Sequence, residues 1–389
     1  MAHPNASVVE RNAFVTVFIS RASCELNVTI PNIMSTAFYL IPGAMLPREV
    51  ASDVLAALPA DVRDALTALG VGREAPGLQR LSEPLHEYSP HRAWLWKVLT
   101  HRTGAPVSAP YAWIAEGGPK LDQEFWALSP WSTDETGHLQ RFTFDEALIP
   151  QLACALDPVI FRLGMRLMIS GTNLFATRRE SLDLTARPFR DLVGMSKTHF
   201  AHLDYLATGA EIELARTIRT AALEAARPIL GDRLQGFWLS GGGFAEPVFP
   251  PSKFRSVVTD DPVSLAWAES AGIPRSALGK LKNRTEWPTA PEGDRILVLD
   301  TLYSAWLAGD WQAWREKVPT LLSALAHWRS LEKAAKIDEN VLVFFGHGGA
   351  ATLLPEKRGA LSFFRRAAKQ PIESWLFDSV DTSASEETA

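Results

Sequence analysis

The sequence Gly236-Phe-Trp-Leu-Ser-Gly-Gly-Gly243 places a short apolar strand directly before a hydroxyl group and three glycines. A strand that is apolar on both faces is typical of the middle of a parallel sheet. Ligands of open α/β sheets bind at the carboxyl ends of such strands, and glycine lets a backbone approach them closely. We therefore predict that a binding site lies beside Ser240, Gly241, Gly242 and Gly243.

Other apolar runs have the length of strands, and helical spacing of apolar residues separates them. The strands are expected at 35–41, 254–259, 295–299 and 340–345, with a further one at 158–166. The helices are expected at 47–69, 145–155 with a kink at Pro150, 197–230, 263–270 and 311–336. This alternation predicts a three-layer α/β fold, in which helices cover both faces of a mostly parallel or mixed sheet.

The chain of 389 residues is long enough for one large domain, which we place at 34–376. Prolines separate aromatic pieces near 76–140, which predicts an irregular insertion with one short helix there. The acidic, Ser/Thr-rich tail 377–389 is expected to be disordered. For residues 1–33 we expect an extension without a fold, either disordered or absent because translation starts at Met34; a signal peptide is the weaker alternative.

The bulk composition excludes several classes of protein. Hydrophobic residues make up 47% of the chain and charged residues 21%, with a net charge of −5. No dense Lys/Arg face is present to bind nucleic acid, and no run of eighteen or more apolar residues is present to span a membrane. The two cysteines, Cys24 and Cys154, are too few for a disulfide framework and are expected to be buried. These features predict a cytoplasmic protein.

Four strand ends carry residues that could act on a ligand. Parallel strands would open on one edge and bring together a hydroxyl, two carboxylates and an imidazole: Ser240, Asp260, Asp300 and His347. Gly348 and the three glycines after Ser240 would add free backbone N–H groups for an anion. Each residue also has a structural interpretation. Ser240 and His347 fit tight turns, and aspartates after a strand often cap the next helix, as Asp261 before Pro262 would do.

A metal site is not expected. His199 and His202 lie three residues apart in a helical segment, but neither an adjacent glutamate base nor a third ligand accompanies them. The glycines match neither the Walker nor the dinucleotide-binding spacing. We therefore expect no metal and no cofactor.

Several blocks, in order, resemble the RpfE-type regulatory proteins of bacteria, a family related to cofactor-independent phosphoglycerate mutase. The matching blocks are Phe38-Tyr-Leu-Ile-Pro-Gly43, Leu156-Asp-Pro-Val-Ile-Phe-Arg162, the strand with Ser240, Val257-Val-Thr-Asp-Asp-Pro262, Ala308-Gly-Asp-Trp-Gln-Ala-Trp314 and Phe363-Phe-Arg-Arg366. The resemblance implies the alkaline-phosphatase-like α/β fold of that mutase.

The mutase chemistry does not carry over with the resemblance. The mutase holds two divalent metals with Asp and His ligands, whereas Ile41-Pro-Gly occupies the place of a first-strand Asp here and no adjacent Asp-His pair is present. The segment 198–227 also departs from the family pattern. We therefore expect a diverged regulatory or ligand-binding protein rather than an enzyme, with an unknown small molecule or protein as its partner.

Two alternatives remain. One is a phosphomutase or phosphatase that uses Ser240, Asp260, Asp300 and His347. The other is a scaffold that presents tryptophans between Trp94 and Trp131 to a partner protein.

Overall fold

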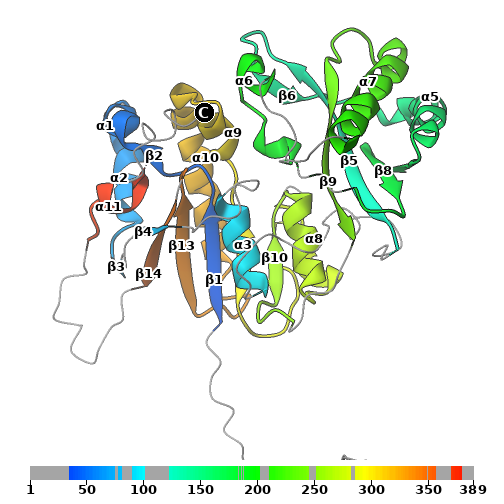
Figure 1. Cartoon of the computed structure of the whole chain (residues 1–389). Helices are drawn as coiled ribbons and strands as arrows, with labels where there is room; N and C mark the ends of the chain where they lie inside the picture. Colours follow the sequence, from blue (N-terminus) through cyan, green and yellow to red (C-terminus); the bar gives the residue numbers. More distant parts are fainter. Residues whose placement is uncertain are drawn as a thin grey trace, which may run out of the picture. The chain divides into compact units, whose positions relative to one another are not determined.

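The computed structural model (Figure 1) describes residues 35–74, 78–80, 90–100, 122–182, 184, 186, 188–201, 210–244, 251–281, 285–347, 349–355 and 369–378. Residues Met34–Ala389 group into one compact unit by their contacts. The expectations for 1–33 and for 379–389 lie outside the described residues.

The larger sheet has eight strands. In order they are β11 (Leu278–Gly279), β10 (Ser256–Val258), β12 (Arg295–Val298), β1 (Thr36–Ile41), β13 (Glu339–Phe345), β14 (Gly349–Pro355) and β3 (Arg73–Glu74), with β4 (Leu78–Arg80) also paired to β14. The first five are parallel, and β14 is antiparallel to its neighbours. The predicted mostly parallel, mixed sheet is confirmed.

Helices cover both faces of this sheet because its strands are apolar on both sides. Along β1, Tyr39 and Ile41 enter one core and Leu40 enters the other, as the two-residue period of a strand requires. The first core contains side chains of α1 (Arg48–Ala56), α2 (Ala60–Ala68), α9 (Tyr303–Leu307), α10 (Trp311–Ser330) and α11 (Glu373–Leu376). The second contains those of α3 (Pro90–Thr100) and α8 (Pro262–Ser270). The α/β fold class is thus as predicted (Figure 1).

A second sheet, which the sequence did not predict, is antiparallel throughout. Its strands are β5 (Glu124–Thr133), β6 (Leu139–Arg141), β7 (Arg166–Ser170), β8 (Asn173–Arg178) and β9 (Gly236–Phe244), and its core includes side chains of α5 (Ile149–Arg162) and α7 (Ala210–Leu230). The strand with Ser240 is β9, so its predicted place in the parallel sheet is wrong. Phe237, Trp238 and Leu239 are all buried, and a short buried run does not tell an antiparallel strand from a parallel one.

Prolines account for two further differences. The helix expected at 47–69 divides into α1 and α2, because Pro59 is the N-cap of α2. The helix and strand expected between 145 and 166 are one helix, α5, which begins with Pro150 in its first turn and continues through Pro158.

Within 76–140, the described residues contain one short helix, as expected there, namely α3, together with the strands β4, β5 and part of β6. Phe377 and Asp378 of the expected tail form β15 (Phe377–Asp378), which pairs with β2 (Leu46–Pro47). Cys154 is exposed rather than buried. Across the described residues, no helix is both long and apolar enough to cross a membrane.

Candidate functional site

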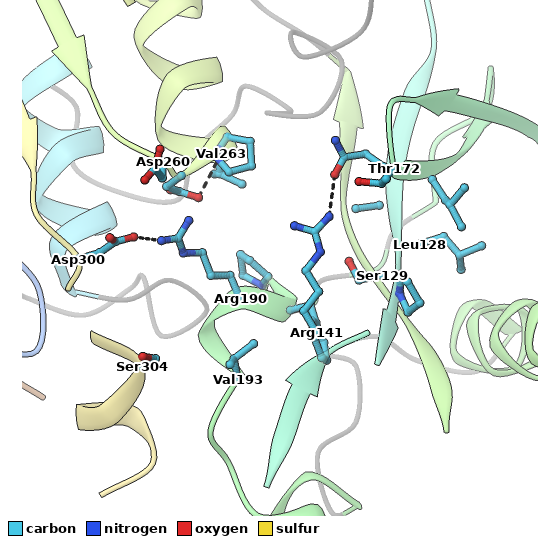
Figure 2. A pocket seen from close by; sticks show the side chains of 18 of the residues that line it. Leu128, Ser129, Arg141, Thr172, Arg190, Val193, Asp260, Val263, Asp300 and Ser304 are labelled. Carbon is cyan, nitrogen blue, oxygen red and sulfur yellow. Dashed lines mark hydrogen bonds and ion pairs between the residues drawn. The ribbon is translucent and has the colours of Figure 1, made fainter. Parts of the chain in front are cut away.

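A cavity of about 430 Å³ lies between the carboxyl ends of β10 and β12 and the second sheet. This volume falls in the range of small-molecule sites. Figure 2 shows Asp260, Asp300 and Ser304 on one side and Ser129, Arg141 and Thr172 on the other, with Arg190 between them. The described lining also contains Arg92, Asp261, Tyr303 and Asn173.

The strand-end wall of the cavity is acidic. Asp260 follows β10 and Asp300 follows β12, and because these strands are parallel neighbours, both aspartates reach the same edge. Asp300 forms an ion pair with Arg190, from the short 3-10 helix η2 (Phe189–Asp191) (Figure 2). Asp300 is not the cap of α9, whose N-cap is Leu302. The structural interpretation of Asp300 as a helix cap is therefore wrong.

The opposite wall is basic. Arg141, the last residue of β6, donates from Nη2 to Oδ1 of Asn173 at 3.0 Å, and Ser129 and Thr172 also line this wall (Figure 2). Every acidic residue of the described lining lies on the strand-end side. Arg92 and Arg190 pair with Asp261 and Asp300 on the strand-end side, whereas the second sheet contributes the Arg141 guanidinium to the described lining and no carboxylate.

A buried ion network lies behind the strand-end wall. Arg92 of α3 donates from Nε to Oδ2 of Asp261 at 2.9 Å, from Nη2 to Oδ1 of Asp261 at 2.8 Å, and from Nη1 to Oδ1 of Asp191 at 2.6 Å. Tyr303 donates its hydroxyl to the same oxygen of Asp191 at 3.3 Å. Bidentate, charge-assisted bonds of this kind hold both partners in one geometry. The network fixes α3, η2 and the start of α8 to one another.

Asp261 has two functions in this network. As predicted, it caps α8, accepting from the backbone N–H groups of Val263 at 3.4 Å and Ser264 at 3.1 Å. Burial by itself would raise the pKa of Asp261, but the positive charges of Arg92 and Arg190 lower that pKa below the ordinary value of an aspartate. Asp261 therefore stays ionised and holds Arg92.

Ser240 is not in the described lining of the cavity. It lies fully buried in β9, and its Oγ has no hydrogen-bond partner among the described residues. The glycines that follow it have positive φ, and a Cβ on Gly242 would overlap the indole ring of Trp126. Packing against Trp126 therefore explains why glycine is needed at that position. A ligand-binding function for Ser240, Gly241, Gly242 and Gly243 stays a prediction, and Gly348 lies outside the described residues.

His347 lies at the end of β13, but it too is outside the described lining. Its ring centroid is 4.2 Å from that of Trp306, and its backbone N–H donates to Oδ2 of Asp378 at 2.6 Å. Burial lowers the pKa of His347, although the charges of Asp378 and Glu49 oppose this shift. The structure brings Asp260 and Asp300 to one cavity, but not Ser240 or His347.

Two tryptophan side chains bind the backbone of the turn that follows β1. The indole N–H groups of Trp314 and Trp306 donate to the carbonyls of Gly43 at 2.8 Å and Met45 at 2.7 Å. Gly43 has a φ of 70°, and Trp306 and Tyr303 pack directly against it. The turn after β1 is therefore packed against the Trp306 and Trp314 side chains.

No group of three or more His, Cys, Asp or Glu side chains within the described ranges is arranged to hold a metal ion. The side chain of His199 and the whole of His202 lie outside those ranges.

Sequence reasoning missed the three arginines of the cavity. Arg92 could have been found, because it directly precedes the apolar run Ala93-Trp-Leu-Trp96 and a charge beside such a run needs a buried partner. Arg141 and Arg190 lie in polar segments with no comparable signal. Their convergence depends on the second sheet, which was not predicted.

No protein-family model matches this chain, and no curated protein matches it. Among solved structures, the PH0037 protein from Pyrococcus horikoshii aligns with a TM-score of 0.50 and 11% identity, over 88% of this chain and 93% of that chain. A cofactor-independent phosphoglycerate mutase from Thermoplasma acidophilum aligns with a TM-score of 0.38 and 11% identity, over 88% of this chain and 94% of that one. At a TM-score of 0.38, the similarity to the mutase is too low to establish a common fold. The match to the PH0037 protein shows that this chain shares the fold of that protein.

Proposed function

We propose that this protein binds a small anionic molecule in the cavity between the strand ends and the second sheet, with Arg141 as the principal anion-binding residue. The observation that carries the proposal is the cavity itself, in which the Arg141 guanidinium lies beside the polar side chains of Ser129, Thr172 and Asn173. Guanidinium groups bind carboxylate and phosphate through paired, charge-assisted bonds.

The surrounding structure supports binding. The buried network of Arg92, Asp191 and Asp261 gives the cavity a fixed wall, so little ordering of the protein is needed when a ligand enters. A preformed site with a few polar groups in an otherwise apolar lining is the usual form of a small-molecule site.

Isothermal titration with ethyl phosphate tests this proposal. We expect binding at millimolar concentrations or below, and at least tenfold weaker binding by Arg141→Ala, because each lost charge-assisted contact costs about 1.5–3 kcal/mol. Arg166→Ala is the matched control, since Arg166 is exposed on β7 of the same sheet and is not in the described lining. Equal binding by Arg141→Ala and wild type, or no binding by the wild type, would contradict the proposal.

A regulatory role, a bacterial origin and a cytoplasmic location extend this proposal and rest on the sequence resemblance and composition. In such a protein, ligand occupancy would be the regulated signal. The phosphatase or mutase alternative requires turnover. Incubation with a phosphomonoester, manganese and zinc would support it if phosphate were released and if Asp260→Asn and Asp300→Asn abolished that release.

A further inference from the structure

We propose that the ligand of this cavity is amphipathic, with one anionic group at Arg141 and an apolar body that lies against Val193, Pro262 and Leu307. The inference rests on the proposed function and adds the chemical class of the ligand. Its basis is the lining of the cavity, in which the polar groups on the strand-end side are bonded within the protein while apolar side chains keep exposed surface.

The cavity is larger than the anion-binding part of it requires. At about 430 Å³ it falls in the range of sites that hold whole small molecules. The polar side chains of Ser129 and Thr172 lie on the same side as Arg141 (Figure 2), and Asn173 accepts a hydrogen bond from Arg141. An anionic group held there leaves the rest of the ligand against other residues of the lining.

The polar groups on the strand-end side already have partners within the protein. The bonded pairs are Arg190–Asp300, Arg92–Asp261, Tyr303–Asp191 and Lys317–Ser304. Asp260 also has a partner. Because the guanidinium groups of Arg92 and Arg190 are paired with carboxylates, a second anionic group would have to compete with those carboxylates. We therefore infer a ligand with a single anionic group.

Three apolar residues of the lining are only partly buried: Val193, Pro262 and Leu307. They come from separate parts of the chain, namely the segment after η2, the first residue of α8 and the last residue of α9. Figure 2 shows Val193 and Val263 on two sides of the cavity, so apolar surface is not confined to one wall. A ligand that covers this surface removes apolar area from water, which favours binding.

A polar body would gain less in this cavity. Hydroxyl groups placed against Val193, Pro262 and Leu307 would lose their hydrogen bonds to water and would find no donor or acceptor on those side chains. A phosphate ester of a sugar or of glycerol would therefore bind less tightly than an alkyl phosphate of the same size.

A series of phosphate esters tests the inference by isothermal titration: ethyl, propyl and butyl phosphate, with glycerol 1-phosphate as the polar counterpart of propyl phosphate. We expect the affinity to rise about three- to fourfold with each added methylene, the factor by which burial of one such group changes an equilibrium constant. Propyl phosphate should bind about tenfold more tightly than glycerol 1-phosphate, because two hydroxyl groups would lose their hydrogen bonds to water.

Two variants locate the parts of the ligand. Val193→Thr adds a hydroxyl at almost constant volume, so it should lower the ratio of butyl to ethyl phosphate affinity and change the affinity for ethyl phosphate little. Val71→Thr is the matched control, since Val71 is 47% exposed and is not in the described lining. Arg141→Ala should weaken binding of all the esters by the same factor and leave the ratio unchanged.

The outcomes separate the two proposals. If the wild type binds none of the esters, or if Arg141→Ala binds butyl phosphate as tightly as the wild type does, the proposed function itself fails. If ethyl and butyl phosphate bind equally and Arg141→Ala weakens both, the cavity binds anions and only the amphipathic inference is overturned. Equal binding of glycerol 1-phosphate and propyl phosphate, or an unchanged ratio in Val193→Thr, would also overturn it. Should Val193→Thr not fold, the wild-type series still decides.

Discussion

The guanidinium of Arg92 binds the carboxylate of Asp261 through two parallel hydrogen bonds, of 2.9 Å and 2.8 Å, while both side chains are almost completely buried. This pair joins α3, on one face of the large sheet, to the start of α8 at the cavity wall. The network that holds the wall in place therefore lies next to the proposed binding site.

Arg92→Met should destabilise the protein by about 3–5 kcal/mol, because it leaves two buried carboxylates without their cation. Arg92→Lys should also be destabilising, since an ammonium group cannot form the same paired bonds. Urea unfolding monitored by tryptophan fluorescence would measure both. The exposed Arg166→Met provides the control and should change stability by less than about 0.5 kcal/mol. If Arg92→Met lowered the free energy of unfolding as little as the control does, the ion network would contribute little to stability.

Acid should weaken the same pair. The pKa of Asp261 is lower in the folded protein than in the unfolded chain, where it is about 3.9. The stability that this shift contributes is therefore present above about pH 4, and it is lost as the pH falls towards the lower folded pKa. The difference in unfolding free energy between wild type and Asp261→Asn should be largest at neutral pH and should narrow below about pH 4. A difference that stays constant through that range would contradict the pKa assignment.

The burial of His91 predicts a second and milder effect of pH on the stability of the protein. Burial lowers the pKa of His91 well below its usual value, its Nδ1 has no hydrogen-bond partner among the described residues, and its ring packs edge-on against Tyr303 at 5.0 Å. The unfolded chain takes up the proton first, so stability should fall as the pH drops below about 6.5.

His91→Phe should remove part of this loss, because phenylalanine fills a similar volume and does not titrate. Thermal unfolding between pH 7.5 and pH 5 would measure the effect, with each pH treated as a separate comparison to wild type. The pKa of His347 is also lowered by burial, so His347 would account for some of the pH dependence of stability that remains in His91→Phe. If His91→Phe were as sensitive to acid as the wild type, His91 would not be the titrating group.

Gly242→Ala should be strongly destabilising, by about 3 kcal/mol or more, because its methyl group would overlap the Trp126 indole and its φ is 105°. Gly231→Ala is the matched control, since Gly231 has a φ of 81° but open space around its Cβ position. The control should lose only about 1 kcal/mol from backbone strain. Chemical unfolding would measure the loss of unfolding free energy in both variants. If the two losses were similar, the contact with Trp126 would not be the reason that position 242 requires glycine.

The sequence predicted the large sheet well, because its strands carry a physical signal that needs no tertiary information. Runs such as 295–299 and 340–345 are apolar on both faces and are separated by helical periodicity. The placement of Ser240 failed for the opposite reason: burial on both faces is common to β9 and to a central parallel strand, so the pattern alone could not assign its sheet.

The candidate site was predicted only in part. Asp260 and Asp300 follow strands that are parallel neighbours, so strand order alone brings them to one edge. Arg141 and Arg190 reach the cavity because the second sheet and η2 lie across from that edge. No local pattern encodes such a long-range arrangement.

The most direct test of the central claim is a crystal structure of the protein soaked with tungstate, an electron-dense analogue of phosphate. We expect an anomalous peak inside the cavity, within hydrogen-bond distance of the Arg141 guanidinium, and no such peak in Arg141→Ala. A peak at the strand ends away from Arg141, or an empty cavity at a tungstate concentration that saturates binding in solution, would contradict it.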